Sequence, residues 1–494
     1  MLNRRNFLRN VGLTGSVLAV PPAILASPGT PATQTPASLE IILRGRVTGG
    51  GQGIAGIAVS DGSSVVATNE KGEYEFPSTV NTEFVFISIP SGYEIPAKDG
   101  IPEFYRQLKK PSGTVVNDFE LEKLAGDDSK HVLVVWADTQ MATKEDAAQL
   151  RTKVVPDLKE LLGNYPQGTQ FVGLGCGDLI WDKFEIFSDY REAVAQTGIP
   201  FYNLIGNHDL DFDARSDENS AITFKRQFGP TWYSFNRGAV HYIMLDNVFF
   251  VGVGKKYIGY LSEQQLLWLE QDLALVKKGA TVIVGMHIPT ATGLFKRQKK
   301  EEEFGMFLCN RKQLYRILQP YQVHIMSGHT HFNENWEQPG IMEHNHGAVC
   351  GAWWTGPICS DGTPAGYGVY EIDGTDVRWY YKSTGFTRDK QFRIYQKGRV
   401  KEFPAEIAVN VWNWDPKWKV EWLEAGVVKG NMVQRVGMDP WAVELYEGKE
   451  LPVKQKWVEP TLNDHLFFAR PSAGARQVTI RVTDRFGKVY EENV

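Results

Sequence analysis

The sequence predicts an α/β domain flanked by two β-rich domains, and three observations lead to this prediction. From about residue 39 to 124, short Val/Ile/Phe runs alternate with turn signals such as Asp61-Gly62, a pattern typical of a small β-sandwich. From about 125 to 373, apolar runs alternate with helical patterns, as in layered α/β domains. From 374 to 494 the helical periodicity fades and strand-like runs remain, which indicates a third, β-rich domain.

The length of the chain agrees with this organisation, and its charge bears on possible partners. The chain has 494 residues, more than the roughly 250–300 at which single cores stop growing. Its formal net charge is −5, with 42% hydrophobic and 22% charged residues. No basic cluster follows the first few residues, so composition offers no electrostatic reason to expect a nucleic-acid partner.

The N-terminus predicts export. Residues 1–26 carry Arg4-Arg5 before Phe7-Leu8, then a short apolar stretch and Ala26. This is the pattern of a twin-arginine signal peptide, and the alternative is an amphipathic N-terminal helix. Residues 27–38, rich in Pro, Thr and Ser, are predicted to be a linker. No cysteine precedes Cys176, so we expect no lipid anchor, and a periplasmic or secreted location.

Local patterns add three expectations. Ser262 to Val276 has helical periodicity, and Ser262 with Gln265 is predicted to form a capping box. The run "DVRWYY", 376–381, is assigned to the third domain. The four cysteines are too few for a disulfide framework, and whether Cys350 pairs with Cys359 is open.

Five apolar runs of the central segment each end in polar residues of metal-ligand type. The first three endings are Asp138-Thr139-Gln140, Gly177-Asp178 and Gly206-Asn207-His208-Asp209; the others are His287 and Gly328-His329-Thr330-His331. Strand ends of layered α/β sheets share one edge, where ligands bind. A single histidine there is more often a satisfied core residue, but five such endings in succession favour a shared site.

These motifs resemble the calcineurin-like metallophosphoesterase family, whose blocks follow the same order. The combination of Gly206-Asn207-His208-Asp209 with Gly328-His329-Thr330-His331 is specific. With its flanking β domains, the chain resembles the bacterial three-domain subgroup. The resemblance implies a metallophosphoesterase-type α/β sandwich, an N-terminal domain like immunoglobulin or transthyretin sandwiches, and a C-terminal β-rich domain.

The resemblance also implies a dinuclear metal site and the role of each residue. Asp138, Gln140 and His331 would bind the first metal, and Asp178 would bridge both. Asn207, His287 and His329 would hold the second. His208, oriented by Asp209, would contact the phosphate and favour departure of the leaving group, while a hydroxide bridging the metals attacks phosphorus. The positive charge of two divalent ions exceeds the negative charge of the two carboxylates. The surplus suits a hydroxide and a phosphate anion.

Two departures from the family pattern stand out. Gln140 replaces the usual histidine, and its oxygen is a harder and weaker donor than imidazole. This shifts the expected metals from Zn²⁺ toward Mn²⁺ or Mg²⁺. We expect two divalent ions, Mn²⁺ first, with Fe, Zn²⁺ or Mg²⁺ as alternatives. Asp182 in "GDLIWD" comes one position late and is left out of the ligand set.

Neighbouring residues have open roles. His344 and His346 are expected near the site without binding metal, and His241 and His324 in the core. Trp353-Trp354 are expected either to line a substrate cleft or to pack against the third domain.

The sequence therefore predicts an exported, metal-dependent phosphoesterase that hydrolyses a phosphate mono- or diester of a small molecule or an envelope component. Substrate identity and oligomeric state do not follow from the sequence. The alternative is a non-catalytic envelope binding protein, in which Gln140 weakens the metal site and the β domains bind glycan or protein. The intact Asn207, His208 and His287 argue against this alternative.

Overall fold

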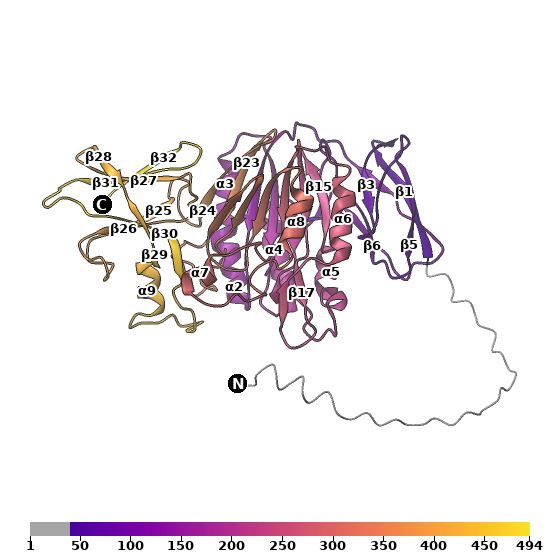
Figure 1. Ribbon diagram of the computed structural model, residues 1–494. Coiled ribbons are helices and arrows are strands. Elements are labelled where there is room, and N and C mark those ends of the chain that lie inside the picture. Colours follow the sequence, from indigo (N-terminus) through magenta and orange to yellow (C-terminus); the bar gives the residue numbers. More distant parts are fainter. Residues whose placement is uncertain (1–39) are drawn as a thin grey trace, which may run out of the picture. The chain divides into compact units, whose positions relative to one another are not determined.

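The structure is a computed structural model, and it describes residues 40–494 (Figure 1). The predicted signal peptide (1–26) and linker (27–38) lie outside the described residues. Within the described part of the chain, no helix has the length and apolar character needed to cross a membrane.

The N-terminal segment forms two sheets that share one hydrophobic core, as its alternation predicted. Along β5, every second residue from Tyr74 is buried, because successive side chains of a strand point to opposite faces. The immunoglobulin or transthyretin type stays a prediction. The strands are β1 (Glu40–Gly49), β2 (Gln52–Gly53), β5 (Glu73–Thr79), β10 (Thr114–Val116) and β11 (Phe119–Leu121) in one sheet, β3 (Ala58–Ser60), β4 (Val65–Ala67), β6 (Phe84–Ile87) and β9 (Tyr105–Gln107) in the other, and the ribbon of β7 (Ala97–Lys98) and β8 (Ile101–Pro102).

The central segment contains two larger sheets. The first has the order β14-β13-β12-β23-β24, with β12 to β14 parallel. The second has the order β15-β16-β19-β20-β22-β21, with β16, β19, β20 and β22 parallel. The strands are β12 (Lys130–Trp136), β13 (Gln170–Cys176), β14 (Phe201–Leu204), β23 (Gly366–Asp373), β24 (Asp376–Ser383), β15 (Tyr233–Arg237), β16 (Val240–Met244), β19 (Thr281–Gly285), β20 (Gln322–Ser327), β21 (Glu334–Gln338) and β22 (Ile341–Asn345), with the ribbon of β17 (Val248–Phe250) and β18 (Tyr257–Gly259).

The alternation of β12 explains how the two sheets pack. Leu133 and Val135 join the core that also contains Val282 and Val284 of the second sheet. Val134 and Trp136 point to the opposite face, into a core shared with α3 and α4. The first sheet is therefore buried on both faces, which explains why β12 is a continuous apolar run.

Helices cover the outer faces of the two sheets, as Figure 1 shows for α3, α6 and α8. Ser262 caps α6 by accepting from the backbone N–H of Gln265. The predicted capping box is wrong in its second half, because the Gln265 side chain hydrogen-bonds the backbone of Asp246 instead (2.7 and 3.0 Å). The helices are α2 (Lys144–Gln149), continued by a π-helical turn (Leu150–Val154) into α3 (Val155–Gly163), then α4 (Phe187–Thr197), α5 (Ile222–Phe228), α6 (Glu263–Leu273), α7 (Leu294–Gln298) and α8 (Arg311–Leu318).

The predicted boundary at residue 374 is wrong in position. The run "DVRWYY" forms β24, which pairs antiparallel with β23 from the Asp373–Asp376 pair outward. Gly374, with φ 62°, makes the tight turn between them. The chain therefore returns along the central sheet as its edge strand before it enters the third domain.

The C-terminal segment contains two four-stranded antiparallel sheets, as predicted, and one short helix. Both sheets contribute to one core, with Val409 and Phe467 from the first and Val420 and Ile480 from the second. The elements are β25 (Phe392–Tyr395), β26 (Ile407–Val411), β29 (Val433–Met438) and β30 (Leu462–Ala469), then β27 (Lys419–Glu424), β28 (Val427–Asn431), β31 (Val478–Thr483) and β32 (Val489–Asn493), and α9 (Pro440–Tyr446).

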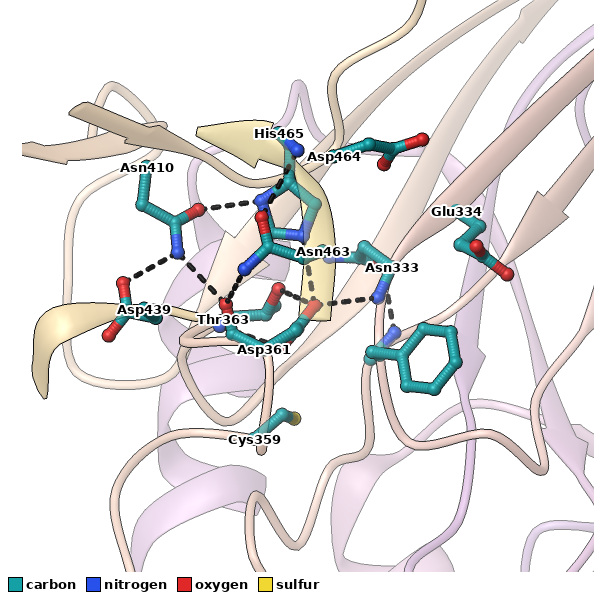
Figure 2. A network of polar contacts seen from close by, with 12 residues as sticks. Asn333, Glu334, Cys359, Asp361, Thr363, Asn410, Asp439, Asn463, Asp464 and His465 are labelled. Atoms are coloured by element: carbon teal, nitrogen blue, oxygen red, sulfur yellow. Dashed lines mark hydrogen bonds and ion pairs between the residues drawn. The ribbon is translucent and has the colours of Figure 1, made fainter. Parts of the chain in front are cut away.

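A buried polar network around Asp361 joins the central and C-terminal segments (Figure 2). The Asp361 carboxylate accepts from the backbone N–H of Asn333 (3.1 Å) and lies 3.2 Å from His465 Nε2. Asn410 donates its amide to the Asp361 carbonyl (2.9 Å), and its oxygen lies 2.7 Å from His465 Nδ1. Because Asn333 comes two residues after His331, this network holds the end of that loop against the C-terminal domain.

Candidate metal centre

The predicted ligands follow the carboxyl ends of parallel strands in both central sheets. Asp138, Asp178 and Asn207 come after β12, β13 and β14, whereas His287 and His329 come after β19 and β20. All but the half-buried His329 are buried. The prediction that these strand endings converge is confirmed by the distances between their side chains.

One group of contacts joins the two sheets. His287 Nε2 lies 3.4 Å from Asp178 Oδ1, 3.1 Å from Asn207 Oδ1 and 3.2 Å from His329 Nδ1. The ligand atoms of Asp178, His287 and His329 all lie within 4.8 Å of one another, close enough to hold a metal ion. The resemblance assigns four residues to the second metal, and these four lie together: Asp178, Asn207, His287 and His329.

A second group lies around Asp138. His331 Nε2 is 3.4 Å from Asp138 Oδ1, and the backbone N–H of His329 donates to the same carboxylate (2.9 Å). The backbone N–H of Gln140 donates to the Asp178 carbonyl (2.8 Å), and its Nε2 to Asp178 Oδ2 (3.2 Å). Gln140 thus lies beside the carboxylate that would bridge two metals.

Three buried atoms of this site fit a cation. Gln140 Oε1, His329 Nε2 and His331 Nδ1 have no hydrogen-bond partner among the described residues. Leaving a buried polar atom unpaired costs about 1–3 kcal/mol. The amide oxygen accepts only, and a neutral imidazole nitrogen without its proton does the same, so a metal ion would satisfy these atoms. The residues present fit the implied metals.

The backbone of the site is held in a sparsely populated conformation. Asp138, Gln140, Asp178, His329 and His331 all have φ between 39° and 71°. For non-glycine residues this left-handed region costs on the order of 1–3 kcal/mol and is concentrated at functional sites.

Close packing beneath the ligands explains one of the glycines in the motifs. A Cβ atom at Gly206 would lie 2.0 Å from the backbone nitrogen of Asp178. Any side chain at this position would therefore displace the loop that carries Asp178.

The partner of His208 is Asp182. His208 Nδ1 lies 2.7 Å from Asp182 Oδ1, and Lys255 forms an ion pair with the same carboxylate. The predicted orientation of His208 by Asp209 is wrong. Asp209 is fully buried and accepts from the backbone N–H of Leu179 (3.0 Å), so it shapes the loop beneath His208 instead.

Electrostatics at the site favour positive charge. Burial opposes protonation of His287, but the Asp178 carboxylate outweighs it and raises the pKa of His287 to about 9. Burial, and then the charge on His287, lowers the pKa of His329 to about 3. The Asp178 and Asp138 carboxylates thus attract positive charge, while His329 stays neutral and can bind a cation.

Four further histidines of the central segment have partners within the fold. His344 Nε2 lies 3.0 Å from His324 Nδ1, and His346 Nε2 lies 2.7 Å from the Tyr370 hydroxyl. His241 Nε2 lies 2.8 Å from Asp272. These contacts agree with the predicted core positions of His241 and His324, whereas a role of His344 and His346 beside the site stays a prediction. Cys350 and Cys359 are both free and buried.

A buried carboxyl, Glu343, connects the strand ends that carry His287 and His329. It accepts from the backbone N–H of Thr290 (2.7 Å) and from the Ser327 hydroxyl (3.1 Å). Burial raises the pKa of Glu343 to about 7 against the opposing effect of these hydrogen bonds.

The raised pKa of Glu343 predicts that the stability of the fold depends on pH. Its pKa is 4.5 when unperturbed and about 7 in the fold, so its stabilising effect is complete below pH 4.5 and is lost as the pH rises through 7. From pH 5 to 8, the free energy of unfolding of the wild type should fall by about 2–3 kcal/mol relative to Glu343→Gln. Urea denaturation across this range measures the difference, and parallel curves for the two proteins would contradict the assignment.

The fold and the candidate site together define a class of protein. It is an α/β sandwich in which carboxylate, amide and imidazole side chains that could hold a metal ion lie at the carboxyl ends of the strands. Three family models match in succession, the N terminal of calcineurin-like phosphoesterase at residues 41–124, calcineurin-like phosphoesterase at 131–333, and the C terminal of calcineurin-like phosphoesterase at 343–490. The chain belongs to the calcineurin-like phosphoesterase family, in its three-domain form.

Individual relatives are similar to this chain over only part of their length. Purple acid phosphatase 15 of Arabidopsis thaliana is 26% identical over 148 residues, which cover 28% of this chain and 25% of that protein. The probable glycerophosphodiester phosphodiesterase GpdQ of Arcobacter nitrofigilis is 27% identical over 155 residues, 30% of this chain and 51% of that protein. The matched part thus spans a quarter to a half of these relatives.

Solved structures with similarity include a dimetal phosphatase from Danio rerio and the purple acid phosphatase PPD1 from yellow lupin. The first has a TM-score of 0.35 and 16% identity, with 52% of this chain and 96% of that chain covered. The second has a TM-score of 0.38 and 14% identity, with 70% and 67% covered.

Proposed function

We propose that this chain is an exported, metal-dependent hydrolase of phosphate mono- or diesters. The observation that carries the proposal is the convergence of Asp178, Asn207 and His287 from two sheets, beside a Gln140 oxygen without a partner. Family membership supports the reaction class. The name of the Arcobacter relative supports a diester among the substrates, and Arg4-Arg5 supports export to the periplasm or the medium.

Two divalent ions, Mn²⁺ first, are proposed for the site. Asp138, Gln140 and His331 would hold one, and Asn207, His287 and His329 the other, with Asp178 between them. Such ions would supply positive charge to a bound phosphate and lower the pKa of a bound water. The oxygen of Gln140 in place of imidazole supports Mn²⁺ over Zn²⁺.

The proposed role of His208 is to hold a proton at the leaving-group oxygen. Its Nδ1 is held by Asp182, which leaves Nε2 as the atom that faces the substrate. Burial lowers the pKa of His208, but the Asp178 and Asp182 carboxylates outweigh it, so that this pKa lies above its usual value. A protonated imidazole beside the phosphate can also hydrogen-bond a phosphoryl oxygen.

The proposal is tested by metal content and turnover together. Elemental analysis of the purified chain is combined with hydrolysis of bis-p-nitrophenyl phosphate and p-nitrophenyl phosphate, with and without added Mn²⁺. We expect Mn²⁺-dependent turnover of at least one ester. In Gln140→His, Zn²⁺ should bind more tightly, on the order of tenfold, because imidazole is the better Zn²⁺ donor.

Two results would contradict the proposal in different ways. Absence of turnover with every added metal, in wild type and in Gln140→His alike, would favour the non-catalytic binding protein. Turnover that survives complete removal of metal by a chelator would leave an esterase but exclude the metal-dependent mechanism.

A further inference from the structure

Two tryptophans border the metal centre on one side. The Trp353 ring stacks on His331, with centroids 4.3 Å apart and planes 23° apart. The Trp181 ring meets His208 edge-on, with centroids 5.8 Å apart. Each indole therefore touches one of the histidines assigned to the site, the first a ligand and the second the proton donor.

A third tryptophan reaches the same place from the C-terminal domain. Trp457 packs against Trp353 (4.5 Å between centroids) and against Trp181 (6.0 Å), edge to face in both cases. Trp457 is 53% exposed although its indole contacts two others. Three segments far apart in the sequence thus form one aromatic cluster, here called the indole cluster (Trp181, Trp353 and Trp457), with an open face.

The indole cluster is anchored to the fold. Trp353 and the next residue, Trp354, have φ of 49° and 60°, and Trp354 Nε1 donates to the carbonyl of Thr139 (2.8 Å), between two ligands. On the other side, Thr355 Oγ1 donates to the carbonyl of Lys454 (2.7 Å). The segment that carries Trp353 is therefore held in place before any substrate arrives, which reduces the entropy lost on binding.

The position of the cluster identifies what it would contact. His208 is the proposed proton donor to the leaving-group oxygen, so the organic group on that oxygen lies on the His208 side of the phosphate. Trp181 is the ring in contact with His208, and Trp457 packs against Trp181. Indole faces bind flat aromatic groups by stacking and offer no hydrogen bonds to a polyol from their surface.

We propose that the indole cluster is the leaving-group subsite and selects phosphate esters of aromatic groups, such as a phenol or a nucleobase-bearing alcohol. This inference rests on the proposed function, because it places the leaving group by the role of His208. It also assigns a task to the C-terminal domain, which supplies the exposed ring of the subsite.

The test compares Trp457→Ala with the wild type on two esters, phenyl phosphate and glycerol phosphate, or their diesters if the wild type hydrolyses those. We expect kcat/KM for the phenyl ester to fall by about 10- to 100-fold, mainly through KM, and that for the glycerol ester to change less than twofold. Trp457→Phe should restore most of the loss. Val453→Ala, in the same segment and 94% exposed, is the matched control and should change neither.

Equal losses on both esters, or no loss on the phenyl ester, would overturn the subsite. So would a Trp457→Phe variant as weak as Trp457→Ala. If the wild type hydrolyses neither ester with any metal, the proposed function fails, and binding then decides the inference separately. By calorimetry, the wild type should bind phenylphosphonate at least tenfold more tightly than methylphosphonate, and Trp457→Ala should not; equal affinities in the wild type would overturn the subsite.

Discussion

Replacing His208 by alanine is expected to lower kcat by about 10²- to 10⁴-fold for an alkyl phosphate ester. The reason is that an alkoxide leaves poorly without a proton, and His208 is the imidazole held by Asp182 beside the ligands. For a p-nitrophenyl ester the loss should be much smaller, because this leaving group departs without protonation. The measurement is kcat for both esters, with metal content determined on the same preparation.

Metal content separates this role from ligation. His208→Ala should keep the metals of the wild type, since its ring is bound to Asp182 rather than to the ligand set. Asp182→Asn should show a milder form of the same pattern, because the amide still holds the ring but lacks the charge. Loss of metal in His208→Ala, or equal losses on both esters, would make His208 a ligand or a structural residue.

Asp178→Asn is expected to lower both metal affinity and activity strongly. Asp178 is buried, accepts from the backbone N–H of His208 (2.8 Å) and lies beside His287 and Gln140. Removing its charge takes away one of the two carboxylates that would face the proposed metal ions, an effect of about 3–5 kcal/mol for a buried pair. We therefore expect metal affinity and kcat/KM each to fall by at least about 10²-fold.

A carboxylate elsewhere provides the control. Asp189 on α4 is also buried, and it pairs with Lys144 and Arg151 rather than with the site. Asp189→Asn should lower the free energy of unfolding but leave the metal content of the folded protein unchanged. If Asp178→Asn retains its metals and its turnover, Asp178 is not the bridging ligand.

The sequence by itself predicted the central architecture and most of the side chains that the structure brings together at the candidate metal centre. The apolar run Val132–Trp136 ends at Asp138, and the glycine-containing motifs mark where the next ligands follow their strands. Such features are local, because a strand and the turn after it are set by neighbouring residues. Parallel strand ends share an edge within one sheet, so clustering along each sheet followed from the sequence, whereas the packing of the two sheets brings His287 beside Asp178 and Asn207.

The tertiary structure alone decided contacts between segments that are distant along the chain. Asp182 rather than Asp209 holds His208, and Trp457 reaches Trp353 from about 100 residues away. β24 belongs to the central sheet, although its sequence was assigned to the third domain. Alternation and spacing specify which face a residue occupies, but not its partner across an interface. The partner depends on packing of whole domains, which no local pattern encodes.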